Sequence, residues 1–287
     1  MQDAHRRVRK IVAKGQRHPP GVAKSEFPQD NFNRESVRNS NFVPVIGTHT
    51  LFCGRKLMRE ERLQFSYDKL IHSADFNQHI QKYNIEVDLL EVRRFFMACK
   101  PIKALMLYFD GKDVQDGMVQ IKHNHFVLSD ISLTCDVFQD YSNYQILSGM
   151  AYLITCCSEE EQLFKHEEMN YHFIQNTCVG MVRHIMMQNF RSMTRNEYRG
   201  RPNIWFTKGF GPGYYGMELK EGKSIHKLIK GERIGVTYQG EMMHPLKSTI
   251  GVAFSYAAEE AVRSNPCNYC NAANRDCMFC DDFRSGF

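Results

Sequence analysis

Apolar residues recur at helical spacing along two long stretches of the chain. In the first, residues 57–99, the side chains of Leu63, Tyr67 and Leu70 fall on one side of a helix. Pro101 follows the stretch, and proline has no N–H group with which to continue a helix. The pattern predicts that residues 57–99 are helical.

The second stretch, residues 142–190, joins a continuous apolar run to a long amphipathic stripe. The run at 146–157 is far shorter than the roughly 20 residues that a transmembrane helix needs, and it favours a buried helix. Ser158 and Glu161 then stand at the spacing of a capping box, which marks a helix start. The stripe that follows consists of apolar residues at helical spacing, namely Phe164, Tyr171, Ile174, Cys178, Met181, Val182 and Ile185.

Two regions have the composition of short strands, one near 103–128 and one near 203–254. In the first, Asp110 and Gly111 separate two runs and predict a hairpin turn. In the second, glycines separate short β-branched and aromatic runs. The sequence as a whole therefore predicts an α+β fold that is predominantly helical, with central helices at 57–99 and 142–190 and an extended N-terminal arm.

Changes in composition divide the chain into four parts. Residues 1–50 are expected to form a basic N-terminal arm, and residues 51–200 a mainly helical core. Residues 201–264 are rich in glycine and are expected to form a mixed α/β part, and residues 265–287 form a cysteine-rich tail.

The arm combines a short amphipathic helix with separated aromatic residues. A helix of about three turns is marginal in water, so this one needs a partner surface. Four prolines lie between residues 16 and 50 and disfavour regular structure there, and single aromatic side chains in such an arm fill pockets on a neighbouring surface. The candidate assembly residues are therefore Arg6, Arg7, Val8, Ile11, Val12, Phe27, Phe32 and Phe42.

Composition and charge narrow the protein class. The hydrophobic fraction is 43%, which is typical of a globular protein and excludes disorder over the whole chain. The formal net charge of +5 is too small to indicate nucleic-acid binding by itself. The chain shows neither a secretory signal nor a membrane span, so we expect it in the cytoplasm or the nucleus.

Four cysteines lie in the tail as two C-x-x-C pairs, Cys267, Cys270, Cys277 and Cys280. Four thiolates can bind one zinc ion, although zinc ribbons usually have a longer spacer between the pairs. The same residues can instead form disulfides within the tail or between chains, or they can remain thiols. We therefore expect no cofactor, with one zinc ion as the alternative.

Two further motifs match functional patterns only in part. The segment GFGPGYYG at 209–216 has the glycine spacing of a dinucleotide-binding loop, but Gly222 interrupts the helix that should follow. This favours a surface loop. His123 and His125 are two residues apart, so on a strand they would share one face, yet no further ligands stand at metal-site spacing.

The absence of a linear catalytic motif leads to a structural hypothesis in which no residue is catalytic. We expect a self-assembling protein, held by exchanged arms and cysteine cross-links, such as a viral capsid, matrix or occlusion-body (polyhedrin-type) lattice protein, whose partner is a copy of itself. The alternative is a zinc-stabilised intracellular protein that binds nucleic acid or an acidic partner through its basic N-terminus. An enzyme without a linear signature is a third possibility.

Deletion of residues 1–24 tests the arm hypothesis. The amphipathic helix needs an external surface and the rest of the chain does not, so the truncated protein is expected to stay folded while losing any higher assembly. Size-exclusion chromatography measures this. A large species of unchanged size after truncation would contradict arm exchange.

Overall fold

The structure, a computed structural model, describes residues 47–53, 56–73, 76–77, 101–156, 169–262 and 269. The chain divides into two units, Met1–Asn39 with Gly286 and Ser40–Ser285 with Phe287. Every described residue belongs to the second unit, and the fold is that of this unit.

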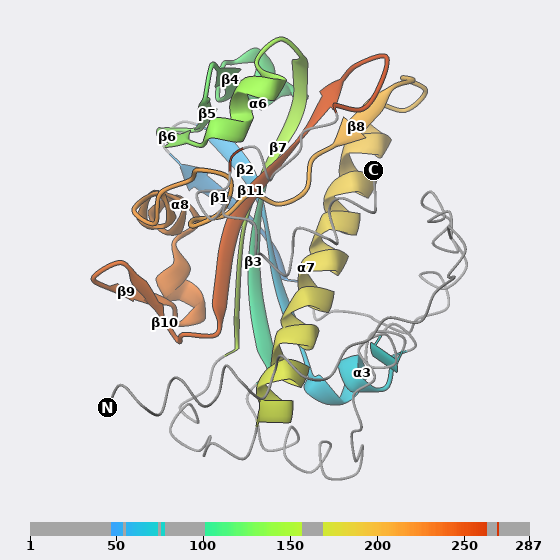
Figure 1. The fold of residues 1–287 in the computed structure, drawn as a ribbon. Coiled ribbons are helices and arrows are strands. Elements are labelled where there is room, and N and C mark those ends of the chain that lie inside the picture. Colours follow the sequence, from blue (N-terminus) through green and yellow to red (C-terminus); the bar gives the residue numbers. More distant parts are fainter. Residues whose placement is uncertain are drawn as a thin grey trace, which may run out of the picture. The chain divides into compact units, whose positions relative to one another are not determined.

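A six-stranded sheet is the main element of the second unit (Figure 1). All neighbouring strands in it are antiparallel. In spatial order the strands are β1 (Gly47–Cys53), β2 (Lys56–Phe65), β3 (Ile102–Phe109), β7 (Gln145–Cys156), β11 (Ser248–Ala257) and β8 (Ile204–Phe206). One sheet therefore contains strands from both sides of residue 200.

The prediction of a predominantly helical fold is wrong. Residues 57–65 and 145–156, both expected in helices, lie in β2 and β7. Every residue of β7 except the first is buried, because other elements cover both faces of the sheet. A strand buried on both faces loses the alternation of polar and apolar residues, so its sequence resembles that of a buried helix. Much of the remainder of the stretch 57–99 lies outside the described residues.

Helix α7 (Met169–Glu197) covers one face of the sheet, together with the short α3 (Tyr67–Ile71) (Figure 1). Its fully buried apolar side chains recur every four residues, at Ile174, Cys178, Val182, Met186 and Phe190. They pack against residues of β3 and β7 that point to this face, such as Met106 and Ile154. The predicted stripe is confirmed at Ile174, Cys178 and Val182, while the expected helix start at Ser158 lies outside the described residues.

Smaller elements cover the opposite face. They are α6 (Gly111–Gln115), the antiparallel strands β4 (Val119–Lys122), β5 (His125–Leu128) and β6 (Ile131–Thr134), the 3-10 helices η1 (Asp136–Tyr141) and η3 (Gly231–Ile234), and α8 (Glu221–Ile229). Asp110, expected in a hairpin turn, instead caps α6, because its side chain accepts hydrogen bonds from the N–H groups of Lys112 and Asp113. A separate hairpin, β9 (Thr237–Gln239) and β10 (Met242–His244), precedes β11.

Hydroxyl groups buried between the sheet and α7 satisfy one another. Ser148 Oγ lies 2.7 Å from Thr194 Oγ1 and 2.6 Å from Ser255 Oγ, which links β7, α7 and β11. Nearby, the Tyr108 hydroxyl donates to one oxygen of Glu197, and Gly111 N donates to the other. These contacts hold the C-terminal end of α7 against the sheet and give each of these groups a hydrogen-bond partner.

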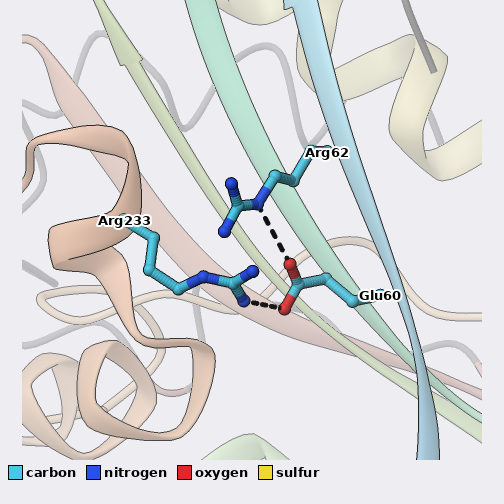
Figure 2. A network of polar contacts seen from close by, with 3 residues as sticks. All are labelled: Glu60, Arg62 and Arg233. Atoms are coloured by element: carbon cyan, nitrogen blue, oxygen red, sulfur yellow. Dashed lines mark hydrogen bonds and ion pairs between the residues drawn. The ribbon is translucent and has the colours of Figure 1, made fainter. Parts of the chain in front are cut away.

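A buried carboxylate joins the sheet to the elements on its opposite face. Glu60 on β2 is fully buried, and its two oxygens bind Arg62 on the same strand and Arg233 on η3 (Figure 2). The Arg62 Nε–Glu60 Oε1 distance is 3.2 Å. Two guanidinium groups compensate the cost of burying the charge, so removal of either partner should be costly.

Replacement of Val182 by Asp tests the packing of α7. Val182 is fully buried, and an unpaired carboxylate there would cost several kcal/mol, enough to prevent folding. Ser192→Asp is the matched control, since Ser192 is exposed on the same helix. Thermal unfolding followed by circular dichroism distinguishes the two variants. Equal melting temperatures would mean that this face of α7 is not buried.

Candidate small-molecule pocket

The chain after β8 continues along β11 and forms one side of a pocket. Thr207 N donates to Phe254 O, and Phe254 N donates to the Thr207 hydroxyl, each at 3.0 Å. Farther along, Phe210 and Val252 exchange two backbone hydrogen bonds of 2.8 Å. The register shifts by one residue between these two points, as it does at a β-bulge, and the Thr207 hydroxyl acts there as the acceptor in place of a backbone carbonyl.

The ladder stops at Pro212. In an antiparallel pair the next hydrogen-bonded position after Phe210 and Val252 would join residue 212 to Ile250. Proline has no N–H to donate, and the chain turns at Gly213, whose φ is +84°. The N–H and C=O of Ile250 therefore face outward, and neither has a hydrogen-bond partner within the described part of the chain.

Glycines leave room for the Tyr152 side chain both in the segment after β8 and on β11. A Cβ added at Gly209 would lie 2.5 Å from Tyr152 Oη, and one added at Gly251 would lie 2.6 Å from the same atom. Both positions must therefore lack a side chain for the phenol of Tyr152, which starts on β7, to reach its place. Tyr152 is 2% exposed and belongs to the pocket wall.

The pocket has a volume of about 400 Å³, which is within the range of small-molecule sites. Its walls come from β7, α7, the loop 209–219, the β9–β10 hairpin and the start of β11. Four of the lining residues are tyrosines, Tyr152, Tyr214, Tyr215 and Tyr238, and Ile250 lies in the lining with a backbone N–H and C=O that have no hydrogen-bond partner among the described residues. The charged lining residues are Arg183 on α7 and Glu241 in the hairpin turn.

Burial determines the protonation of the tyrosines. It raises the pKa of Tyr152, an effect that the charge of Arg183 and its hydrogen bond to the phenol partly oppose. Burial also raises the pKa of Tyr238 to about 12. Both hydroxyls are therefore protonated at neutral pH and can donate hydrogen bonds to a ligand. Arg183 is exposed as a residue, and its side chain reaches the Tyr152 phenol in the pocket wall, to which it hydrogen-bonds.

The loop at 211–217 is held firmly beside the pocket. Gly213 N donates to Met217 O at 2.9 Å, and Met217 N donates to Tyr214 O at 2.9 Å. Cys135 Sγ donates to Tyr215 O at 3.1 Å, and burial raises the pKa of this thiol to about 12, so it stays protonated. The loop therefore presents Tyr214 from a fixed backbone, with 68% of that residue exposed.

Most of the site residues that the sequence predicts lie elsewhere. The assembly candidates between Arg6 and Phe42 and the tail cysteines from Cys267 to Cys280 lie outside the described residues. His123 and His125 are exposed. No cluster of three or more potential metal ligands occurs among the described residues. Within the same residues, no helix has both the length and the apolar character needed to cross a membrane.

The pocket residues themselves were missed by sequence reasoning, with one partial exception. The segment 209–216 was identified as a Gly/Pro/Tyr loop, and the structure places it in the pocket wall. Its signal was the proline between two glycines, which marks a chain that leaves a sheet edge. Tyr152 and Arg183 carried no signal, because each stands in a run that periodicity assigns to the core or to a solvated face.

Replacement of Gly209 by Ala tests the contact between the glycines and Tyr152. The added methyl would collide with the Tyr152 hydroxyl, so we expect a loss of about 1–3 kcal/mol in the free energy of unfolding. In the Tyr152→Phe background this loss should shrink by at least about 0.5 kcal/mol, since the colliding oxygen is absent. Chemical denaturation of the four proteins of this cycle measures both values.

Gly180→Ala is the matched control for this prediction. Gly180 lies inside α7, and a Cβ there would meet no atom within 4 Å. The helix propensity of alanine should therefore raise the free energy of unfolding by about 0.5–1 kcal/mol. A stability loss at Gly209 that is additive with Tyr152→Phe would show that the hydroxyl is not what excludes a side chain there.

Comparisons with known proteins leave the family open. No protein-family model matches the sequence, and no curated protein is similar to it. Among solved structures, one described as "Crystal Structure of the MetH Reactivation Domain bound to AdoHcy" is similar with a TM-score of 0.48 and 11% sequence identity. The match covers 77% of this chain and 83% of that chain. A likeness at this level carries no conclusion about function.

Proposed function

We propose that this protein binds a small organic molecule at the open edge of β11. The observation that carries the proposal is the stop of the backbone ladder at Pro212, which leaves the Ile250 N–H and C=O facing a pocket of about 400 Å³. An unpaired backbone group in a largely buried position is costly unless a ligand or water satisfies it. Ile250 is only 3% exposed, so a ligand would relieve such a cost.

The pocket favours a planar ligand with a hydrogen-bond donor next to an acceptor. Ile250 offers one donor and one acceptor on the same side of its strand, and a cyclic amide or a similar ring edge complements both. Tyr152, Tyr214 and Tyr238 supply aromatic surface against which a ring can pack. The protonated hydroxyls of Tyr152 and Tyr238 add two further donors.

The charged residues of the lining limit the net charge of the ligand. Arg183 can bind a carboxylate or a single phosphate through its planar guanidinium group. Glu241 lies in the same lining and would repel a ligand with several negative charges. We therefore favour a ring with one anionic substituent over a polyphosphate.

The chemistry of the lining supports binding as the role of the pocket. Tyr152, which is buried, and Tyr238, which is half-buried, are donors with raised pKa values and do not act as bases near neutral pH. The Ser248 hydroxyl donates to Pro245 O at 2.6 Å, which occupies its proton. Self-assembly through the N-terminal arm stays a separate proposal, because the residues that would carry it lie outside the described part of the chain.

Ligand-observed NMR with a panel of bicyclic lactams tests the proposal. Each lactam is used with and without a carboxylate and with and without an N-methyl group on the amide. We expect the lactam carboxylates to bind best, and N-methylation to abolish binding because it blocks the hydrogen bond to the Ile250 carbonyl. Equal binding of the N-methylated compounds would contradict the proposed recognition of the ligand by the backbone of Ile250.

Variants of the pocket locate the binding. Arg183→Gln should weaken the carboxylates about tenfold, as expected for the loss of one hydrogen bond to a charged group, and should leave the neutral lactams unchanged. Lys227→Gln is the control, since Lys227 is an exposed cation on α8 that does not line the pocket. If both variants weaken the carboxylates equally, the ligands bind by bulk charge and not at this site.

A further inference from the structure

The outer edge of β8 is a second open edge of the sheet. β8 is the last strand in the sheet order, and its inner side pairs with β11 (Figure 1). Toward β11, Asn203 O accepts from Ala258 N, and Thr207 N donates to Phe254 O. Hydrogen-bonding residues alternate along an antiparallel strand, so the N–H and C=O groups of Ile204 and Phe206 point away from β11. These outward groups have no hydrogen-bond partner in the part of the chain that the structure describes.

A row of arginines on α7 lies beside this edge. Arg191 and Arg195 are one helical turn apart, and their guanidinium carbons lie 5.9 and 5.4 Å from the centroid of the Phe206 ring. Phe206 itself packs edge-on against Phe190, at a centroid distance of 5.8 Å. Stacking on this ring holds two planar cations at the sheet edge, with less freedom to lose on binding than mobile lysines would have.

Within the described part of the chain, Arg191 and Arg195 have no anionic partner. Residues 169–201 contain five arginines, at 183, 191, 195, 199 and 201, and one carboxylate, Glu197. The two oxygens of Glu197 are occupied by the Tyr108 hydroxyl and by Gly111 N. Neither Arg191 nor Arg195 forms an ion pair within the described residues, and the buried Nε of Arg191 has no acceptor there.

The two sides of the edge differ in character. Phe206 and the arginines lie on the α7 side of the sheet. The adjacent Trp205 points to the other side, because successive strand residues alternate, and it is 36% exposed. Any strand added to β8 would therefore meet cations on one side and an indole on the other.

We propose that β8 docks an extended acidic segment of a partner protein, which adds to the sheet as a seventh strand. The backbone of the segment would pair with Ile204 and Phe206, its Asp or Glu side chains would bind Arg191 and Arg195, and its alternate apolar side chains would contact Trp205. The preferred sequence alternates acidic and apolar residues, since the side-chain period of a strand is two.

A protein segment fits this surface better than a nucleic acid. Single-stranded nucleic acids need exposed aromatic rings beside the cations on which bases can stack. Here the ring beside the cations, Phe206, is covered by the two guanidinium groups, and the half-exposed Trp205 lies on the other side of the sheet. An edge with paired donors and acceptors also matches a peptide backbone, and a sugar–phosphate chain carries no N–H groups to pair with it.

Fluorescence anisotropy with the labelled peptide Glu-Val-Glu-Val-Glu-Val-Glu tests the proposal. We expect saturable binding that weakens with added salt and is absent for Lys-Val-Lys-Val-Lys-Val-Lys. The block peptide Glu-Glu-Glu-Glu-Val-Val-Val has the same composition and charge, and it should bind at least tenfold more weakly because its pattern does not match a strand. Equal binding of the block peptide, or tighter binding of a twelve-residue oligothymidine, would overturn the proposal.

Two double variants place the peptide on β8. Arg191→Gln with Arg195→Gln should weaken binding at least tenfold. Arg191→Lys with Arg195→Lys keeps the charge but not the planar donors, and should fall between this variant and the unchanged protein. Lys227→Gln serves as the control and should bind normally. Melting temperatures verify that all variants are folded, and unchanged binding by a folded Arg191→Gln, Arg195→Gln protein would exclude this surface.

Discussion

The burial of the sheet on both faces is the constraint on which the rest of the structure depends. Strands β3, β7 and β11 are apolar toward α7 and also toward the smaller elements on the other face. Both faces are therefore used for folding, and polar backbone meets solvent or ligands only at the edges of the sheet. The two candidate sites both lie at such edges, one where the ladder along β11 stops at Pro212 and one along the outer side of β8.

A doubly buried sheet also has to satisfy the polar groups that it encloses. Ser148, Thr194 and Ser255 do this with one another, and Glu60 does it with Arg62 and Arg233. The hydroxyl cluster and the arginine–carboxylate contact differ in the distance that they span. The hydroxyls join elements across a distance of one hydrogen bond, whereas the long arginine side chain lets η3 bind a carboxylate on β2. The second contact ties a segment late in the sequence to an early strand, so it contributes to holding the face opposite α7 in place.

The sequence predicted the part of the fold in which periodicity and environment agree. The stripe at Ile174, Cys178 and Val182 is apolar on one side and polar on the other, because α7 has one buried face and one exposed face. The prediction for residues 145–156 was wrong, because a strand with two buried faces has no polar side from which its period can be recognised. The Asp110–Gly111 pair failed for a different reason: aspartate before glycine suits both a hairpin turn and a helix N-cap, and only the tertiary structure selects the cap. The pocket depends on residues 60 positions or more apart that meet at one edge, such as Tyr152 and Pro212, and no local pattern encodes that meeting.

The two edges illustrate different ways to keep a sheet from pairing indiscriminately. At β11 a proline ends the ladder, and a loop and a hairpin line the space beside the strand. At β8 the edge is short and is flanked by arginines, a composition that repels copies of the same chain because like charges would meet. Such a charged edge blocks self-pairing and aggregation but attracts a strand of opposite charge. Protection and selective recognition are therefore two consequences of one arrangement, in which Phe206 fixes the cations beside the open backbone groups of the strand that carries it.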